Sequence, residues 1–511
     1  MPKPISFGEL DFNLVASLEE TSSVPEAEEP FRMMVIGDFS GRANRSLDKS
    51  AKLLTGLKPI RVDRDTLDRV LDRLEVAIEL PLLGENAPPV SIKFSELDDF
   101  HPDALYQQLD IFQTIKDTRQ SFYDPSRLAA FVQELQTAPE ANAESPRETS
   151  NETTGSLLDQ IIEKNQQGQS EGQTSGSVVP PTEWDSFLHG IVKPHLVAKT
   201  HPRQEEMVDV VDAAAGELMR MILHHEDFQA VEAAWRGLSF LVSRLETDSE
   251  LFLLDLSKAD FATDLTGTED LNHTALYKLL VEQTVGTAGG QPWSVVAANY
   301  TFEKEIDDLG TLGRMAKIAK AAGCSFVAAA GDNFLCEKSL AETPDPDDWQ
   351  PREDQGAESS WQALRHIPAA SHLGLCLPRF LLRLPYGADT DQVDAFNFEE
   401  TPITPEHANY LWGNPCFATL LLMGQAFSIQ GWQMRLTATQ EINSLPLHIY
   451  KEEGESHLKP CAETMLSQRA AEQIMDKGLM PLLSFFNQDM VRFGRFQSIA
   501  DPPTRLAGPW S

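Results

Sequence analysis

Residues 218–245 read LMRMILHHEDFQAVEAAWRGLSFLVSRL and form the longest strongly helical and apolar passage of the 511-residue chain. In the second half of this passage, apolar side chains recur at intervals of three and four residues, which places them on one face of a helix. They are Phe228, Val231, Trp235, Leu238 and Val242. The polar run HHED at 224–227 interrupts the pattern. We therefore predict two helices that meet at this run and pack as a hairpin, with Trp235 as structural core.

Strands and helices alternate through the sequence that follows. Apolar runs predict strands at 251–256, 293–298 and 325–330, and helical spacing predicts helices at 276–282, 309–322 and 417–427. This order is typical of an α/β domain with a largely parallel sheet and flanking helices. We further predict an acidic surface loop at 342–360, strands at 432–437 and 447–450, and an irregular tail after residue 482.

The N-terminal part reads as a smaller α/β unit. An alternating run at 5–16 suggests a first strand, and a buried strand at 31–36 runs into the turn GDFSG. Such a glycine-rich turn after a strand invites comparison with a phosphate-binding loop. No Lys-Ser or Lys-Thr pair follows Gly41, however, so we interpret it as a turn. Runs at 76–82 and 90–94 predict a β-hairpin.

Composition changes between residues 138 and 183, where Ser, Thr, Gln, Gly and Pro dominate and acids outnumber bases. Such a stretch buries too little apolar surface to fold alone, so we interpret it as a flexible acidic linker. One apolar island interrupts it, and its side chains share one face of a short helix at 156–164. They are Leu157, Leu158, Ile161 and Ile162. A short amphipathic helix of this kind suits a peptide ligand, and equally a helix that docks on its own protein.

The net charge of −36 argues against nucleic acid and anionic membranes as partners, because their phosphates would be repelled. A basic protein partner is compatible with this charge. The five cysteines are widely spread without a CxxC pair, which favours a reducing cytoplasm and makes a zinc site or a disulfide framework unlikely. No apolar stretch matches a signal peptide or a membrane span. We therefore expect a cytoplasmic protein.

The sequence offers no catalytic signature, since GxSxG, HExxH and Walker motifs do not occur. The neighbouring carboxylates of Glu399 and Glu400 project differently from a helix or strand, so they do not make a glycosidase pair. Helix capping accounts for Asp98, Asp99, His101 and Asp103 around Pro102 as well as a metal site would, and we favour capping. We expect neither an enzyme nor a protein with a cofactor or metal.

Several stretches together resemble the contractile sheath of bacterial type VI secretion systems, which pairs a small (TssB-like) and a large (TssC-like) subunit. FRMMVIGDFSGR at 31–42, IRVDRD at 60–65 and FSELDDFHPD at 94–103 resemble the small subunit. The large subunit is matched by the following stretches. They are LLDQIIE at 157–163, residues 219–241 of the opening passage, PRFLLRLPYG at 378–387, FNFEE at 396–400, YLWGN at 410–414 and GLMPL at 478–482.

The resemblance implies a natural fusion with three parts. We expect a small-subunit-like domain at 1–137, the linker at 138–183 and a large-subunit-like domain at 184–511. It implies a structural component that assembles with other sheath subunits around an inner-tube protein in the bacterial cytoplasm. In this family, the helix that matches 157–163 is the handle that the AAA+ recycling unfoldase grips. Leu157, Leu158, Ile161 and Ile162 are thus the expected unfoldase-binding residues.

One departure from the family pattern bears on assembly. Large subunits of the family continue beyond the region that ends here near Trp510, and the further segments help to interlock the lattice. We therefore expect the chain alone to stay monomeric or form small oligomers. The alternative to a sheath protomer is an accessory component, at the sheath end or near the baseplate, that shares the fold without polymerising alone.

Overall fold

The computed structural model describes residues 28–45, 56, 58–82, 88–123, 204–350, 354–402, 405–437, 440–452 and 454–510. The strand expected at 5–16 and the helix expected at 156–164 lie outside the described residues. The same is true of Leu157, Leu158, Ile161 and Ile162. Within the described parts, no helix has the length and apolar character needed to cross a membrane.

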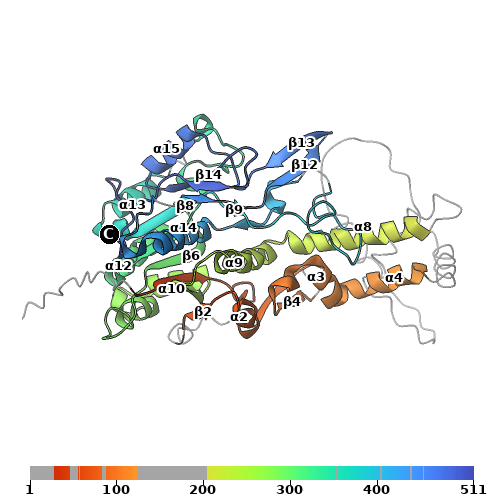
Figure 1. The fold of residues 1–511 in the computed structure, drawn as a ribbon, viewed down its shortest axis with the longest axis horizontal. Coiled ribbons are helices and arrows are strands. Elements are labelled where there is room, and N and C mark those ends of the chain that lie inside the picture. Colours follow the sequence, from red (N-terminus) through yellow and green to blue (C-terminus); the bar gives the residue numbers. More distant parts are fainter. Residues whose placement is uncertain are drawn as a thin grey trace, which may run out of the picture.

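Among the described residues, nine strands form one mixed sheet in the order β11-β15-β14-β8-β7-β6-β1-β5-β2 (Figure 1). Their bounds in this order are Glu441–Ile442, Val491–Phe493, Met480–Ser484, Leu373–Leu377, Ser325–Ala330, Val295–Phe302, Phe31–Gly37, Ser249–Asp255 and Ile60–Val62. The strands from β14 to β5 run parallel, and antiparallel pairs close both ends. The prediction of an α/β fold with a largely parallel sheet is confirmed.

Strand β1 lies inside this sheet although it comes from the N-terminal part of the chain. On one side it pairs with β5, with Phe31 opposite Ser249. On the other side it pairs with β6, with Met33 opposite Val295. The N-terminal segment (residues 28–123) and the C-terminal segment (204–510) therefore build one sheet together, which local sequence patterns did not predict.

Alternate residues of β1 enter two separate cores. Met33 and Val35 belong to one apolar cluster, whereas Met34 and Ile36 belong to the cluster on the opposite face of the sheet. The first face is covered by α9 (Glu226–Val242) and α14 (Pro415–Gln430), and the second by α10 (Lys258–Thr266), α12 (Ile306–Ala322) and α13 (Gln355–Arg365). Because every β1 side chain up to Ile36 except Arg32 is buried, the strand reads as continuously apolar.

The opening passage contains the end of α8 (Gln204–Leu223) and all of α9. Figure 1 shows the two helices end to end, so the predicted hairpin is wrong. The break falls at the expected polar run, where His225 Nδ1 accepts a hydrogen bond from Asp227 N at 3.2 Å and caps α9. The apolar face of α9 packs on the N-terminal segment instead of α8. Phe94 and Phe100, for example, both contact Phe228.

The remainder of the N-terminal segment packs along α8 and α9. It contains α2 (Leu67–Arg73), the antiparallel hairpin β3 (Val76–Leu80) and β4 (Val90–Phe94), α3 (Pro102–Gln108) and α4 (Gln113–Tyr123). The β-hairpin predicted at 76–82 and 90–94 is thus confirmed. Figure 1 shows α4 beside α8, where Arg119 Nε binds Asp212 Oδ1 at 2.8 Å. The last described residue of α4 and the first of α8 lie at the same end of the molecule (Figure 1).

Three local predictions in the C-terminal segment need correction. The expected strand at 432–437 contains part of a 3-10 turn, Gly431–Gln433, whose Trp432 packs on Phe31 and Phe427 without a strand partner. The expected acidic loop contains the start of α13, because Asp354 caps this helix by accepting hydrogen bonds from Gly356 N and Ala357 N. The expected irregular tail contains β15, which pairs with β14.

A buried charged network as the candidate functional site

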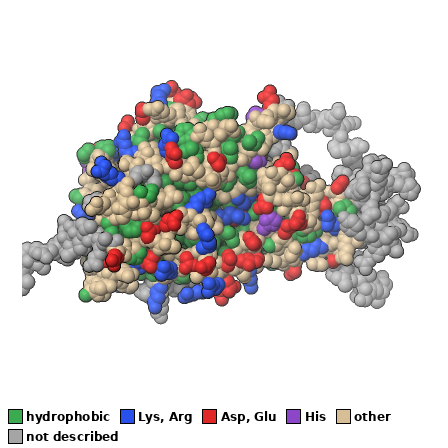
Figure 2. Space-filling model, viewed as in Figure 1, with side chains coloured by type: hydrophobic (Ala, Val, Ile, Leu, Met, Phe, Trp, Pro, Cys, Tyr) green, Lys and Arg blue, Asp and Glu red, His purple; other side chains and the backbone are tan. Residues whose placement is uncertain are grey.

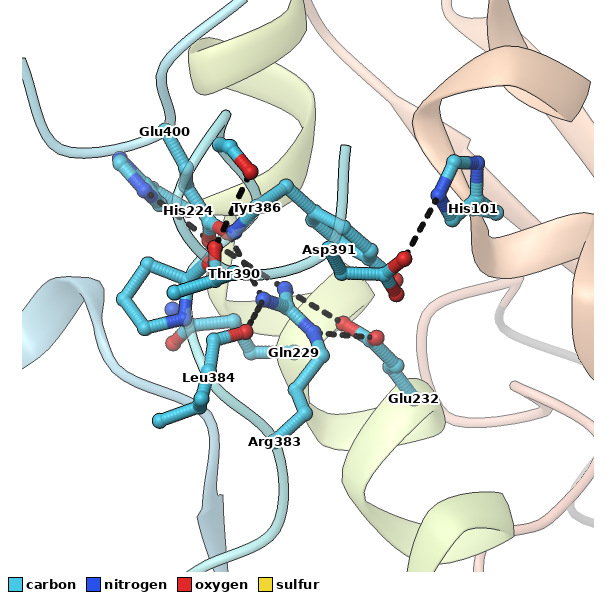
Figure 3. A network of polar contacts seen from close by, with 12 residues as sticks. His101, His224, Gln229, Glu232, Arg383, Leu384, Tyr386, Thr390, Asp391 and Glu400 are labelled. Carbon is cyan, nitrogen blue, oxygen red and sulfur yellow. Dashed lines mark hydrogen bonds and ion pairs between the residues drawn. The ribbon is translucent and has the colours of Figure 1, made fainter. Parts of the chain in front are cut away.

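Arg383 lies at the centre of a charged network that joins α9 to the loop after β9 (Phe380–Leu381) (Figure 3). Its Nε atom donates to Glu232 Oε1 at 2.8 Å, and its Nη1 atom donates to Glu400 Oε2 at 2.7 Å. Glu232 is 0% exposed and Glu400 is 1% exposed. One guanidinium therefore bridges two carboxylates that are shielded from solvent.

Further hydrogen bonds join Arg236 and Tyr386 to this network. Arg236, one turn along α9, donates to Glu232 Oε1 at 2.7 Å and to the Tyr386 hydroxyl at 2.8 Å. The backbone N–H of Tyr386 donates to Glu400 Oε2 at 2.8 Å, and the Arg383 guanidinium lies 4.2 Å from the Tyr386 ring centroid. The charges of two arginines and two glutamates thus cancel in this buried site. Buried charges are tolerated when they are paired and hydrogen-bonded in this way.

The electrostatics follow from this pairing. Burial alone would raise the pKa of Glu400, but Arg383, the nearby His224 ring and hydrogen bonds from Arg383 and Tyr386 lower it to about 2. His224 Nε2 lies 3.5 Å from Glu400 Oε1. Burial raises the pKa of Tyr386 to about 12, against the opposing effect of the nearby arginines. At neutral pH, Glu400 is ionised and Tyr386 keeps its proton, so each hydrogen bond has a defined direction.

The network closes a loop that contacts the N-terminal segment. We call residues 386–400 the strap, since its ends meet where Glu400 N donates to the Tyr386 carbonyl at 2.9 Å. In its middle, the backbone N–H groups of Asp394 and Ala395 donate to the Asp103 carboxylate at 3.1 and 2.8 Å. The ring of His101 also meets Tyr386 edge-on, at 4.9 Å between centroids. The strap is thus held by the buried charges at its base and contacts α3 at its tip.

A second polar junction lies at the end of β1, in the turn after Gly37. Asp255, at the end of β5, accepts hydrogen bonds from Phe39 N at 2.9 Å and from Ser40 N at 3.0 Å. The indole Nε1 of Trp235 donates to the Phe39 carbonyl at 2.8 Å. Gly41 has a φ of +73°, and a Cβ there would lie 2.4 Å from the Ala77 carbonyl. The GDFSG turn therefore joins β1 to β5 and α9.

The structure places the sequence-predicted residues as follows. Phe228, Trp235 and Leu238 are each 0% exposed and Val231 is 4% exposed.

Glu399 and Glu400 point to different partners, because Glu399 accepts from Ala388 N while Glu400 faces Arg383. Asp99 completes a capping box with Glu96, and His101 Nδ1 accepts from Asp103 N at 3.2 Å, as capping residues do.

Sequence reasoning missed Arg383, Glu232 and Arg236 as a group. The signal was nevertheless present, because Arg383 interrupts the apolar run of PRFLLRLPYG and Glu232 adjoins the apolar stripe of α9. A charge at a buried position needs a buried partner of opposite sign. Among the described residues, no group of three or more His, Cys, Asp or Glu side chains is placed to hold a metal ion.

Comparisons with known proteins match the two segments separately. The model of the VipB (EvpB) tail sheath N-terminal domain matches residues 205–500, and the model of VipA from the type VI secretion system matches residues 13–145. A curated relative is the type VI secretion system sheath protein TssC1 of Pseudomonas aeruginosa, 32% identical over 306 residues. The match covers 58% of this chain and 61% of the relative, so the chain spans less than two thirds of the relative's length.

Proposed function

The chain belongs to the tail-sheath family of type VI secretion systems, and we propose that it is a structural protomer that assembles into a contractile sheath around an inner tube. The observation that carries the proposal is the position of β1. This strand lies within the VipA match, and it pairs on both sides with strands of the VipB match. One chain thus supplies both parts of a joined protomer.

A protomer that acts through contacts with other protomers needs internal charges that stay paired while those contacts change. In the network, Arg383 and Arg236 are directed at Glu232, Glu400 and Tyr386, which leaves these groups committed to one another. Figure 2 shows acidic and basic side chains interspersed on the visible face, as suits contacts between protomers by complementary charges. We propose that the protein acts without catalysis, in the bacterial cytoplasm. Hydrolysis of a nucleotide, sugar or ester by the purified chain at an enzymatic rate would contradict this.

The proposal includes two further partners, the inner-tube protein and the AAA+ recycling unfoldase. For the unfoldase, the expected handle is the apolar set on residues 157–162, whose composition supports a peptide ligand. Replacement of Leu157, Leu158, Ile161 and Ile162 by Ser should abolish binding to the unfoldase and leave the melting temperature unchanged. Binding that persists would place the handle elsewhere, and a lower melting temperature would indicate a helix docked on the protein.

Negative-stain electron microscopy of the chain expressed alone tests the assembly proposal. Long, regular hollow tubules would support a protomer that propagates by itself, since a lattice needs complementary surfaces on both sides. Small particles that join along tubules only when another sheath chain is added would fit a protomer that propagates together with that chain. Particles that bind only one end of a tubule would support the alternative, an accessory component. A chain that stays apart from sheath subunits under all conditions would contradict both.

A further inference from the structure

A second polar cluster lies at the base of the hairpin formed by β12 (His448–Glu452) and β13 (Glu455–Lys459). The ammonium Nζ of Lys459 is 2.9 Å from His407 Nδ1. His407 Nε2 is in turn 3.2 Å from Glu463 Oε1. These three side chains form a chain of lysine, imidazole and carboxylate that is separate from the Arg383 network.

The protonation of this chain follows from Glu463. Arg379 donates to its carboxylate from the backbone N–H at 2.8 Å and from Nη2 at 2.6 Å. Burial alone would raise the pKa of Glu463, but His407 and Arg379 lower it to about 2. An ionised carboxylate only accepts hydrogen bonds, so His407 Nε2 must carry the hydrogen. In the neutral imidazole, Nδ1 is then a free acceptor that faces Lys459.

Lys459 is held in a half-buried aromatic setting. Its Nζ atom lies 5.3 Å from the Tyr410 ring centroid and 5.5 Å from that of Trp412, and the His407 ring stacks on Trp412 at 5.0 Å. Burial lowers the pKa of Lys459, although Glu463 acts in the opposite direction. The side chain as a whole keeps intermediate exposure. At a given pH, a larger fraction of such a lysine is in the neutral amine form than for a fully exposed lysine.

We propose that Lys459 is an acylation site for acyl phosphates, with His407 as the base that receives the amine proton. The neutral Lys459 nitrogen attacks the carbonyl carbon of the donor and forms a carbon–nitrogen bond. The carbon–oxygen bond to phosphate breaks, and inorganic phosphate leaves. The proton that His407 Nδ1 takes from the nitrogen passes to solvent. Arg379, whose side chain is 47% exposed and paired with Glu463, lies beside this cluster.

Acylation would alter the hairpin that carries Lys459. The amide product has no positive charge, so it loses the attraction to the Tyr410 and Trp412 rings. The amide keeps a single N–H, so any hydrogen bond that it donates to His407 is no longer charge-assisted. The β12–β13 hairpin is therefore expected to hold less firmly to the segment that carries His407, Tyr410 and Trp412.

The test uses the full chain and acetyl phosphate as the probe, with modified lysines quantified over time by mass spectrometry at pH 8. Lys451 is an internal control, because it is an exposed lysine on the same hairpin. General-base assistance is worth about 10²–10⁴-fold in rate. We expect Lys459 to react at least about tenfold faster than Lys451. Equal or slower reaction of Lys459 would overturn the proposal.

Two further measurements separate a reactive lysine from a merely reachable one. His407→Gln should lower the rate at Lys459 toward that of Lys451 and leave Lys451 unchanged, with folding checked by circular dichroism. If this variant does not fold, the pH–rate profile of the unmodified chain decides. The rate at Lys459 should reach its plateau at a lower pH than the rate at Lys451. An unchanged ratio in the variant would show that His407 does not act as the base, and coincident profiles would show that Lys459 is no more reactive an amine than Lys451.

Discussion

Two of the contact regions that join the N-terminal and C-terminal segments differ in their physical basis. The β1 junction consists of β1, its neighbours β5 and β6, and the contact between Trp235 and Phe39. It is stabilised mainly by apolar side chains and by backbone pairing between strands. The strap junction consists of residues 386–400, their base at Arg383 and their contact with Asp103, and it depends on charge. The first should not lose stability in acid, whereas the second should.

Removal of the Trp235 indole should give the largest effect and break the β1 junction. Trp235→Ala leaves a cavity in a fully buried site and also leaves the Phe39 carbonyl without its donor. The free energy of unfolding should fall by about 3–5 kcal/mol, near the upper end, as measured by denaturant titration. Trp235→Phe, which keeps much of the apolar volume, should cost less. An Ala variant with unchanged stability that fails only in assembly would place the indole at an interface instead.

A slightly smaller loss should follow when the strap junction loses its central charge. Arg383→Met leaves the buried Glu232 and Glu400 without their shared partner, although Arg236 still binds Glu232. We expect a loss of about 3 kcal/mol in the free energy of unfolding. Addition of Glu400→Gln to this variant should restore part of the loss, because it removes one unpaired charge. No recovery in the double variant would mean that packing, and not charge, determines the cost.

The pH dependence should distinguish the junctions by sign. The folded pKa of Glu400 is about 2, below its ordinary value, so its stabilisation is present above pH about 4.5 and is lost as pH falls toward 2. That loss should be on the order of 2–3 kcal/mol. In Asp38, beside β1, burial raises the pKa, so acid should favour the folded state there. In a plot of the free energy of unfolding against pH, Glu400→Gln should make the fall at low pH shallower and Asp38→Asn should make it steeper. The same change in both variants would contradict the assignment.

The tip of the strap should give the smallest effect. Asp103→Asn weakens the hydrogen bonds from Asp394 N and Ala395 N and removes the negative charge that accepts them. The expected cost is about 1 kcal/mol. Hydrogen exchange should be faster at those two amides and unchanged in β1, for example at Val35. Faster exchange at both places would show that the junctions open together and that the comparison between them fails.

The sequence predicted those parts of the fold that depend on local pattern. The strand at Ser325–Ala330 was predicted at its observed bounds, and the helix at 309–322 ends where Gly323 takes a left-handed conformation with φ of +69°. The insertion of β1 could not be predicted in this way, because its partners are chosen by long-range pairing that periodicity does not record. The helix hairpin was predicted wrongly for a related reason. The apolar face of α9 needs a cover, but the pattern does not say which segment supplies it.

The candidate site was predictable only in part. The motifs that resemble the sheath family contain Arg383, Glu232 and Glu400, so the resemblance pointed to the right stretches without indicating a shared site. A charge within an apolar run shows that a partner is needed. It does not identify that partner, because Glu232 and Arg383 are 151 positions apart. The pairing depends on the fold that brings α9 and the strap together.

The central position of β1 also means that the strand is synthesised long before both of its neighbours are available. Met33 leaves the ribosome 262 residues before its partner Val295. At about 5–20 residues per second, this strand waits roughly 10–50 s for its second neighbour. During that time its apolar side chains and unpaired edge are open to other nascent chains. A strand that completes the sheet from its middle therefore leaves the newborn protein exposed to aggregation until β6 emerges.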